Sequence, residues 1–265
     1  MDLLFGRKVN SKAENNFAGT DRILTIPYIS LNRNSVAKIL VVLTSLLILA
    51  STAALLTDYL IGNTSNLVRK LVKFFYVDLE LNAPTFFSTL LLLFAALLLG
   101  FISVLKRKQN AKYAWQWAIL CFGFLLMAFD ETVAAHERLI EPMRSILGEE
   151  NLGILYYAWV VPAIALVLFL AIFFLKFWLS LPAKTRLYFL IAACLYVGAA
   201  IGLELAEGKH SEIYGMDNLT YITLVTIEEG LEMGSVILFI WALLKYIADT
   251  YEEVGLRFDA SKGDL

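Results

Sequence analysis

Residues 84–105 read PTFFSTLLLLFAALLLGFISVL, a run of 22 residues without one charged side chain. A helix of about 20 apolar residues spans the hydrocarbon core of a bilayer. Lipid offers the backbone no hydrogen-bond partners, so only helices or a closed β-barrel can cross it. The run lacks the alternation of apolar and polar residues that barrel strands show, and therefore predicts a transmembrane helix.

The same pattern recurs along the chain. Of its 265 residues, 59 % are hydrophobic and only 17 % are charged. The apolar runs predict an all-α fold, an integral membrane bundle of six transmembrane helices. These spans are expected at 37–60, 84–105, 113–136, 153–178, 187–207 and 219–246.

The distribution of charge predicts the orientation of the bundle. Six spans place both termini on one side of the membrane, and with both termini inside, 16 of the 22 basic residues lie on the inner side. The loop KRKQNAK (106–112) is the clearest inner anchor, because Lys and Arg concentrate in cytoplasmic loops. Of the 24 acidic residues, 16 fall on the outer side or in the outer half of a span. The sequence therefore predicts an N-in, C-in protein, most consistent with the cytoplasmic (inner) membrane of a bacterium.

Outside the spans we expect three further features. Residues 1–35 and 249–265 are polar and are interpreted as cytoplasmic tails around a transmembrane domain of residues 36–248. The stretch TSNLVRKLVKFFYV (64–77) places apolar side chains on one helical face and basic ones mostly opposite. This pattern predicts a short amphipathic helix on the outer membrane surface.

Three stretches place acidic residues where apolar helices approach the outer side: FDETVAAHER (129–138), GLELAEGKH (202–210) and TIEEGLEMGS (226–235). Residues three, four or seven apart share one face of a helix, so each helix can present two or more carboxylates to a common interior. The candidate metal ligands are Asp130, Glu131, His136, Glu137, Glu204, Glu207, Glu228, Glu229 and Glu232.

Such a cluster requires compensation, because one ionised Asp at the centre of a membrane helix already costs about 2.5–3.5 kcal/mol. Protonation, a water-filled cavity or a bound cation would each supply it. Carboxylate oxygens favour Mg²⁺, Ca²⁺ or Mn²⁺, and added imidazole favours Zn, Fe or Mn. We therefore expect a divalent metal ion of unassigned identity.

Some polar residues have simpler interpretations. Glu212 and Asp217 are interpreted as solvated loop residues, and His210 is a ligand or a solvated side chain. Spans one, two and four have uncharged interiors and are expected to face lipid, with spans three, five and six facing one another. Pro162 predicts a kink in span four. Two GxxxG patterns, at 198–202 and 230–234, predict close approach of helix backbones.

The chain resembles a family of uncharacterised bacterial polytopic membrane proteins. In that family the third span ends in a DE…HE stretch and the last span carries EExxEM. The matching residues here are Asp130, Glu131, His136 and Glu137, followed by Glu228, Glu229, Glu232 and Met233. The resemblance implies no activity.

Three functions fit these features. The first is a membrane protein with a divalent-metal site open to the outer side, including a metalloenzyme acting on a lipophilic substrate. The second is a cation- or proton-coupled transporter or channel. The third is a non-catalytic subunit or assembly factor. Whether the protein is an enzyme stays open, as does a membrane-protein partner or a homo-oligomer, whereas nucleic-acid binding has no support in the sequence.

Overall fold

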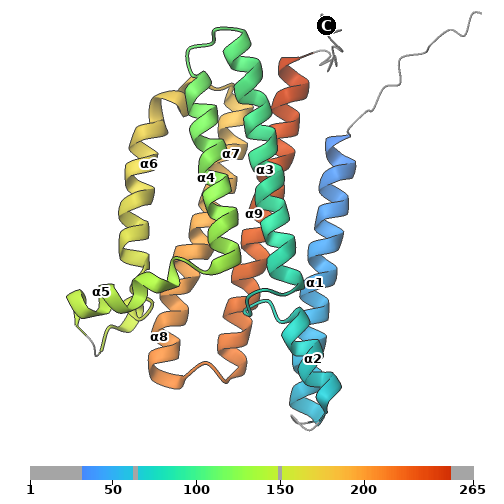
Figure 1. Ribbon diagram of the computed structural model, residues 1–265, viewed down its shortest axis with the longest axis vertical. Helices are drawn as coiled ribbons and strands as arrows, with labels where there is room; N and C mark the ends of the chain where they lie inside the picture. Colours follow the sequence, from blue (N-terminus) through green and yellow to red (C-terminus); the bar gives the residue numbers. More distant parts are fainter. Residues whose placement is uncertain (1–31, 62–64, 149–150, 252–265) are drawn as a thin grey trace, which may run out of the picture. The chain divides into compact units, whose positions relative to one another are not determined.

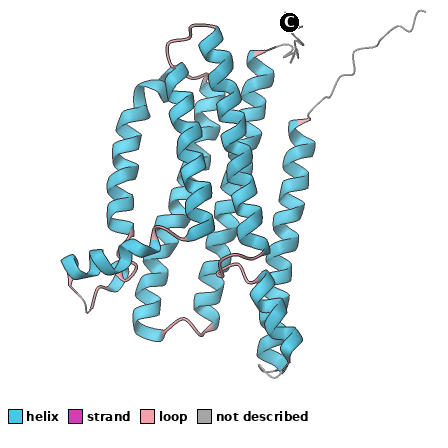
Figure 2. Ribbon diagram, in the orientation of Figure 1, coloured by secondary structure: helices cyan, strands magenta, loops and turns pink. Residues whose placement is uncertain are grey.

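The computed structural model describes residues 32–61, 65–148 and 151–251, and they contain helices and loops but no strand (Figure 2). The predicted tails, 1–35 and 249–265, lie almost entirely outside these residues. The helices are α1 (Arg33–Ile61), α2 (Asn66–Phe75), α3 (Ala83–Lys108), α4 (Ala114–Val133), α5 (Ile140–Leu147), α6 (Val160–Ser180), α7 (Ala183–Val197), α8 (Glu204–Tyr214) and α9 (Leu219–Thr250). A π-helix, Gly198–Leu203, joins α7 to α8, and short 3₁₀ turns occupy Glu137–Leu139 and Gly153–Leu155.

Six of these segments are long and apolar enough to cross a membrane, which confirms the predicted multi-pass membrane architecture. They are α1, α3, α4, α6, α9 and the continuous segment Ala183–Tyr214 made of α7, the π-helix and α8. The loops α3–α4 and α6–α7 lie at the end of the bundle where α1 begins and α9 finishes (Figure 1). The loop between α8 and α9 lies at the opposite end (Figure 1).

Local chemistry sets the helix starts. Asn82 accepts a hydrogen bond from Thr85 N–H and caps α3, and Asn218 caps α9 in the same way through Tyr221 N–H. The fourth span starts at Val160 rather than at residue 153, because residues 153–159 form a 3₁₀ turn and a loop. Pro162 therefore lies in the first turn of α6, where a missing N–H breaks no helical hydrogen bond. The prediction that Pro162 kinks span four is therefore wrong.

The core is built mainly on α3 and α9. Half of the residues in the most apolar stretch of α3 and of α9 are buried inside the bundle. In α4 and in α6 the corresponding share is 11 %. Leu99 and Ile102 of α3 and Ile240 and Leu243 of α9 are completely buried. The expectation that α3 faces lipid is therefore wrong, since an uncharged helix suits a protein core as well as it suits lipid.

Aromatic side chains attach α4, α6 and α7 to this core. The Trp117 ring of α4 lies 5.1 Å from Phe177 of α6 and 5.0 Å from Tyr246 of α9, centroid to centroid. Phe124 stacks on Phe239 at 5.0 Å, and Phe239 also contacts Phe189 of α7 at 4.8 Å. Helices that present little buried area are thus fixed by a few large rings.

Of the four glycines in the GxxxG patterns, one marks a close helix contact among the described residues. A Cβ atom added at Gly198, Gly202 or Gly234 would have no described atom within 4 Å. At Gly230 the nearest atom would be Ile48 Cδ1 of α1, at 3.2 Å. Gly198 and Gly202 instead belong to the π-helix that precedes Glu204.

Candidate functional site

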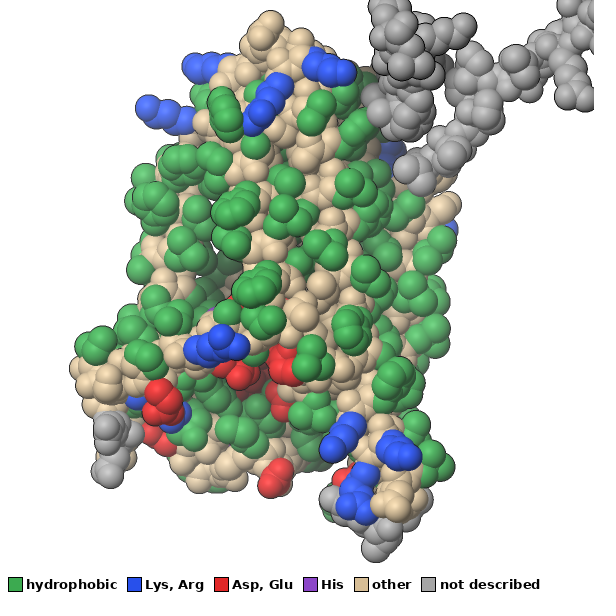
Figure 3. Space-filling view, viewed as in Figure 1, with side chains coloured by type: hydrophobic (Ala, Val, Ile, Leu, Met, Phe, Trp, Pro, Cys, Tyr) green, Lys and Arg blue, Asp and Glu red, His purple; other side chains and the backbone are tan. Residues whose placement is uncertain are grey.

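A polar cavity of about 410 Å³ opens near the α8–α9 end of the bundle, between α4, α8 and α9. Figure 3 shows acidic side chains gathered in a hollow in this half of the molecule. Within the described part of the chain, ten acidic residues and no Lys or Arg line the cavity. They are Asp78, Glu80, Asp130, Glu131, Glu137, Glu204, Glu207, Glu228, Glu229 and Glu232.

All nine residues predicted to bind metal line this one cavity. Their oxygen and nitrogen atoms are not equally close together. One group stands out, formed by Glu204, Glu207 and Glu228, in which one carboxylate oxygen from each residue lies within 4.8 Å of the others. We call these three side chains the glutamate triad. A single cation between these three oxygens could contact all of them, because oxygen ligands lie about 2.3–2.6 Å from a bound Ca²⁺.

Two helices build the glutamate triad. Glu204 and Glu207 are three residues apart on α8 and share its inner face, and Glu228 faces them from α9. Glu207 is only 3 % exposed and Glu228 8 %. Oε1 of Glu207 is fully buried and accepts a hydrogen bond from none of the described residues. A buried carboxylate oxygen without a donor is costly, and either a proton shared with the adjacent Glu228 carboxyl or a bound cation supplies the missing partner.

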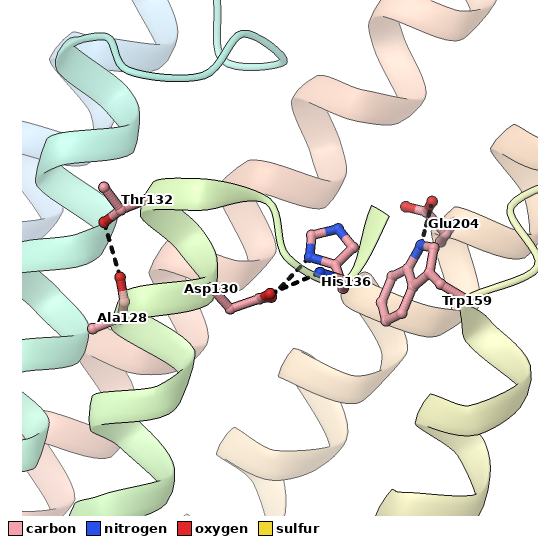
Figure 4. A network of polar contacts seen from close by, with 6 residues as sticks. All are labelled: Ala128, Asp130, Thr132, His136, Trp159 and Glu204. Carbon is pink, nitrogen blue, oxygen red and sulfur yellow. Dashed lines mark hydrogen bonds and ion pairs between the residues drawn. The ribbon is translucent and has the colours of Figure 1, made fainter. Parts of the chain in front are cut away.

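Glu204 is held by an indole. Nε1 of Trp159 donates a hydrogen bond of 3.0 Å to Glu204 Oε1 (Figure 4). The preceding π-helix, with its wider turn, sets the direction in which Glu204 leaves the helix axis. Single π-turns inside α-helices are frequent at functional sites.

A second structure at the cavity is a carboxylate–imidazole pair. Asp130 accepts a 2.9 Å hydrogen bond from His136 N–H at Oδ1, and its Oδ2 lies 2.7 Å from His136 Nδ1 (Figure 4). Helix α4 ends at Val133, and the left-handed conformation of the next residue, Ala134 (φ 44°), turns the chain back so that His136 reaches Asp130. Both oxygens of Asp130 are therefore engaged in orienting the imidazole.

The same pair links to the glutamate triad through an aromatic contact. The His136 ring lies 4.5 Å from the Trp159 ring, centroid to centroid. Burial by itself would lower the pKa of His136, but the hydrogen bond to Asp130 and the charges of Asp130, Glu204 and Glu137 outweigh it and raise that pKa. The site therefore favours an imidazole that holds a proton.

Sequence reasoning missed two acids of the cavity. Asp78 and Glu80 come from the loop between α2 and α3, where they resemble ordinary loop residues. Three hydrogen bonds fix this loop: Val77 N–H to Ser51 Oγ at 3.2 Å, Asn82 Nδ2 to Tyr76 O at 2.6 Å and Thr85 Oγ1 to Leu79 O at 3.1 Å. Three tyrosines that line the cavity were also missed, and they are Tyr157, Tyr196 and Tyr221.

The environment of Asp78 differs from that of a free aspartate. Loss of water around the carboxyl raises the pKa of Asp78 to about 6, and the charge of Glu137 adds to this effect. The hydroxyls of Tyr76 and Tyr221 oppose it. Tyr221 Oη donates a long hydrogen bond of 3.5 Å to Asp78 Oδ1.

Two polar residues near the site have structural roles. His210 does not line the cavity; its Nε2 lies 2.7 Å from Asn218 Oδ1, at the cap of α9. Helix α8 continues past it to Tyr214, seven residues beyond the end of the predicted span 187–207. Glu212, interpreted from the sequence as solvated, accepts 2.8 Å hydrogen bonds from the N–H groups of Leu152 and Gly153.

One family model matches residues 39–247, and its description is a domain of unknown function (DUF8692). The chain belongs to this family. The match includes most of the first and last spans, all of the four spans between them and every member of the glutamate triad. It agrees with the resemblance to uncharacterised membrane proteins that the acidic motifs indicated. Neither the curated proteins nor the solved structures include a match to the chain.

Proposed function

We propose that the protein binds a divalent cation at the glutamate triad, on the outer side of the membrane. The observation that carries the proposal is the buried Glu207 Oε1, which lacks a donor among the described residues while two further carboxylates lie beside it. Three carboxylates in one small volume repel each other, and a dication offsets this repulsion.

The donor set favours a hard ion. All three groups of the glutamate triad supply oxygen, which suits Mg²⁺, Ca²⁺ and Mn²⁺ better than softer metals. The hydrogen bond that Trp159 Nε1–H donates to Glu204 orients this ligand, as hydrogen bonds to metal ligands commonly do. The other acids of the cavity add negative potential that attracts cations from the outer solution.

We further propose that the site is catalytic and acts on a lipophilic substrate. A divalent cation here would supply Lewis-acid chemistry and a more acidic bound water. The chain itself supplies an imidazole that Asp130 orients through Nδ1, which leaves Nε2 as the atom that gives or takes a proton in the cavity. A site that only stores or transports an ion does not need an oriented imidazole beside it.

Transport would require polar groups between the cavity and the inner side. The residues that continue the cavity inward on α4 and α9 are apolar, such as Phe124, Val236 and Phe239. These contacts favour a site closed toward the inner side.

The proposed orientation is N-in, C-in. It is supported by the basic residues around the α3–α4 loop, at the end of the bundle opposite the cavity (Figure 3). Helix α2 carries one basic face and one apolar face, and we place it on the outer surface of the bilayer.

Metal content tests the proposal. Protein purified in detergent without chelator, after supply of Mg²⁺, Ca²⁺ and Mn²⁺, is analysed by mass spectrometry of metals. We expect near-stoichiometric metal in the wild type and its loss in Glu207→Gln and Glu228→Gln. Each change removes one negative charge and one ligand oxygen but keeps the side-chain shape.

The matched control is Glu141→Gln on α5, an exposed glutamate outside the cavity. It should keep its metal. A wild type without metal, or a Glu207→Gln protein that retains it, would overturn the cation site. Loss of a partner protein on pull-down in Glu207→Gln, with no metal in either protein, would instead support the subunit or assembly role.

A further inference from the structure

A second cavity, of about 460 Å³, lies next to the acidic one and differs from it in chemistry. It lies between α4, α6, α7 and α9, is partly open to the surroundings, and is lined almost entirely by hydrocarbon and aromatic side chains. Its four walls include Phe124 of α4, Phe174 and Trp178 of α6, Ala193 of α7 and Phe239 of α9. Both cavities have the volume of common ligand pockets, about 300–1,000 Å³.

The two cavities are adjacent and share two wall residues. Met127 of α4 and Tyr196 of α7 line both of them. One turn beyond Met127, α4 reaches Asp130, and on α9 the wall changes from Val236 to Glu232 within four residues. Each of these helices therefore passes from an apolar to an acidic wall at the same level.

An apolar cavity beside an acidic one matches the shape and polarity of an amphiphile. We propose that the paired cavities bind a lipid with part of one hydrocarbon chain between α4, α6 and α7 and its polar head at the acidic cavity. The inference deepens the proposed function by naming the substrate class, and it rests on that function for the role of the metal. The apolar cavity spans about 10 Å of helix rise between Leu120 and Met127 of α4.

The walls also constrain the head group. An anionic head such as a phosphate or carboxylate would meet ten acidic residues and no Lys or Arg in the described lining. A divalent cation at the glutamate triad would offset only two of these negative charges. Desolvating like charges next to each other is strongly unfavourable. The head is therefore uncharged or cationic, as in a long-chain alcohol, amide or amine.

Photo-crosslinking tests this assignment. The probes are a long-chain alcohol and a long-chain amine with a diazirine near the chain end, and a fatty acid of the same length is the comparison. We expect alcohol and amine to label peptides of α6 and α7 that contain Phe174 and Ala193, in competition with unlabelled lipid. The fatty acid should label these peptides about tenfold less.

A cavity-filling variant sharpens the test. Ala165 and Ala171 are both exposed residues of α6, but Ala171 lines the apolar cavity and Ala165 lines neither cavity. Ala171→Phe should reduce labelling about tenfold, because each methylene group kept out of the cavity weakens binding about fourfold. Ala165→Phe should leave labelling unchanged, and the thermal unfolding of both variants reports whether the bundle is intact.

The outcomes separate this inference from the cation site. Labelling spread equally over exposed residues such as Phe169 and Ile172, or unaffected by Ala171→Phe, would overturn the lipid assignment even if metal is bound. Preferential labelling by the fatty acid would overturn the head-group assignment. Specific labelling in a wild type that binds no metal would keep the lipid site and reject the proposed metal chemistry.

Discussion

Asp130 and Glu207 are both acids on apolar helices, yet the structure gives them opposite surroundings. Both carboxylate oxygens of Asp130 are bonded to His136, at 2.9 Å and 2.7 Å. Glu207 Oε1 has no donor among the described residues. Asp130 therefore orients a neighbour, whereas Glu207 keeps a buried oxygen available for a cation or for a proton shared with Glu228.

Trp159 lies between the imidazole and the glutamate triad, and its replacement tests whether it positions Glu204. In Trp159→Phe the ring contact with His136 is kept, but the hydrogen bond to Glu204 Oε1 is lost. We expect affinity for Mn²⁺, measured by isothermal titration calorimetry, to fall about 10- to 100-fold. Trp115→Phe, an exposed position at the far end of α4, is the control and should bind as the wild type does.

A fall in affinity without loss of thermal stability would support a positioning role. Equal affinity in Trp159→Phe and the wild type would show that Glu204 needs no support from the indole.

Asp78 gives a prediction about pH. Its pKa in the folded protein is about 6, above the ordinary 3.8, so the folded state binds more protons than the unfolded state between these values. Stability is then lost as pH rises from about 4 to 6, and Asp78 disfavours the folded state at neutral pH. We expect Asp78→Asn to raise the melting temperature at about pH 7, and the difference from the wild type to shrink as pH falls below about 5.

Asp217→Asn, an exposed aspartate in the α8–α9 loop, is the control for this experiment. It should show no comparable pH-dependent difference. A constant difference between Asp78→Asn and the wild type across the pH range would contradict the titration of Asp78.

At the scale of elements, the segment α7–π–α8 decides the geometry of the site. The sequence indicates one continuous apolar span here, and the structure confirms continuity from Ala183 to Tyr214. The π-helix Gly198–Leu203 was not predicted, because its residues are equally compatible with an α-helix. Its wider turns change the direction of every following side chain, including Glu204 and Glu207.

Gly208 lets α8 approach the chain that carries Trp159. A Cβ atom added at Gly208 would lie 3.2 Å from Tyr156 Cβ and 3.3 Å from Tyr157 Cδ2. We expect Gly208→Leu to push residues 156–159 away, to weaken Mn²⁺ binding more than tenfold and to destabilise the protein by about 1–3 kcal/mol. Calorimetric titration and thermal unfolding measure the two effects.

The matched control is Gly234→Leu on α9, where an added Cβ would have no described atom within 4 Å. It should retain both binding and stability. Normal binding in Gly208→Leu would show that the 156–159 segment can shift without disturbing Glu204.

At the scale of the whole molecule, the orientation in the membrane decides which solution reaches the acidic cavity. The proposed N-in, C-in topology places Lys108, at the end of α3, inside and Asp217, between α8 and α9, outside. The native cysteines, Cys121 and Cys194, are free and can be changed to Ala before single cysteines are introduced. A membrane-impermeant maleimide applied to intact cells should label Asp217→Cys and leave Lys108→Cys unlabelled until lysis.

The reverse labelling pattern would place the cavity on the cytoplasmic side. It would leave the geometry of the glutamate triad unchanged but would require a cytoplasmic source of cation and substrate.

The sequence by itself determined the fold class, the six spans and the acidic stretches of the site. Hydrophobic length is a local property, because a helix in lipid satisfies its own backbone whatever its neighbours are. Charged residues inside such segments are so costly that their functional importance is also visible locally. The nine candidate ligands found in this way all line one cavity in the structure.

Only the tertiary structure decided which acids lie together and which helices form the core. The distance between Glu207 and Glu228 depends on how α8 packs against α9, and Asp78 enters the cavity because Ser51 and Asn82 hold its loop. Lipid tails are as apolar as the side chains of these helices, so moving an apolar helix face from lipid into the protein core yields no hydrophobic free energy. Hydropathy therefore cannot show that α3 is buried and α4 exposed. Shape, aromatic contacts and a few hydrogen bonds make that choice, and they arise only when the helices pack.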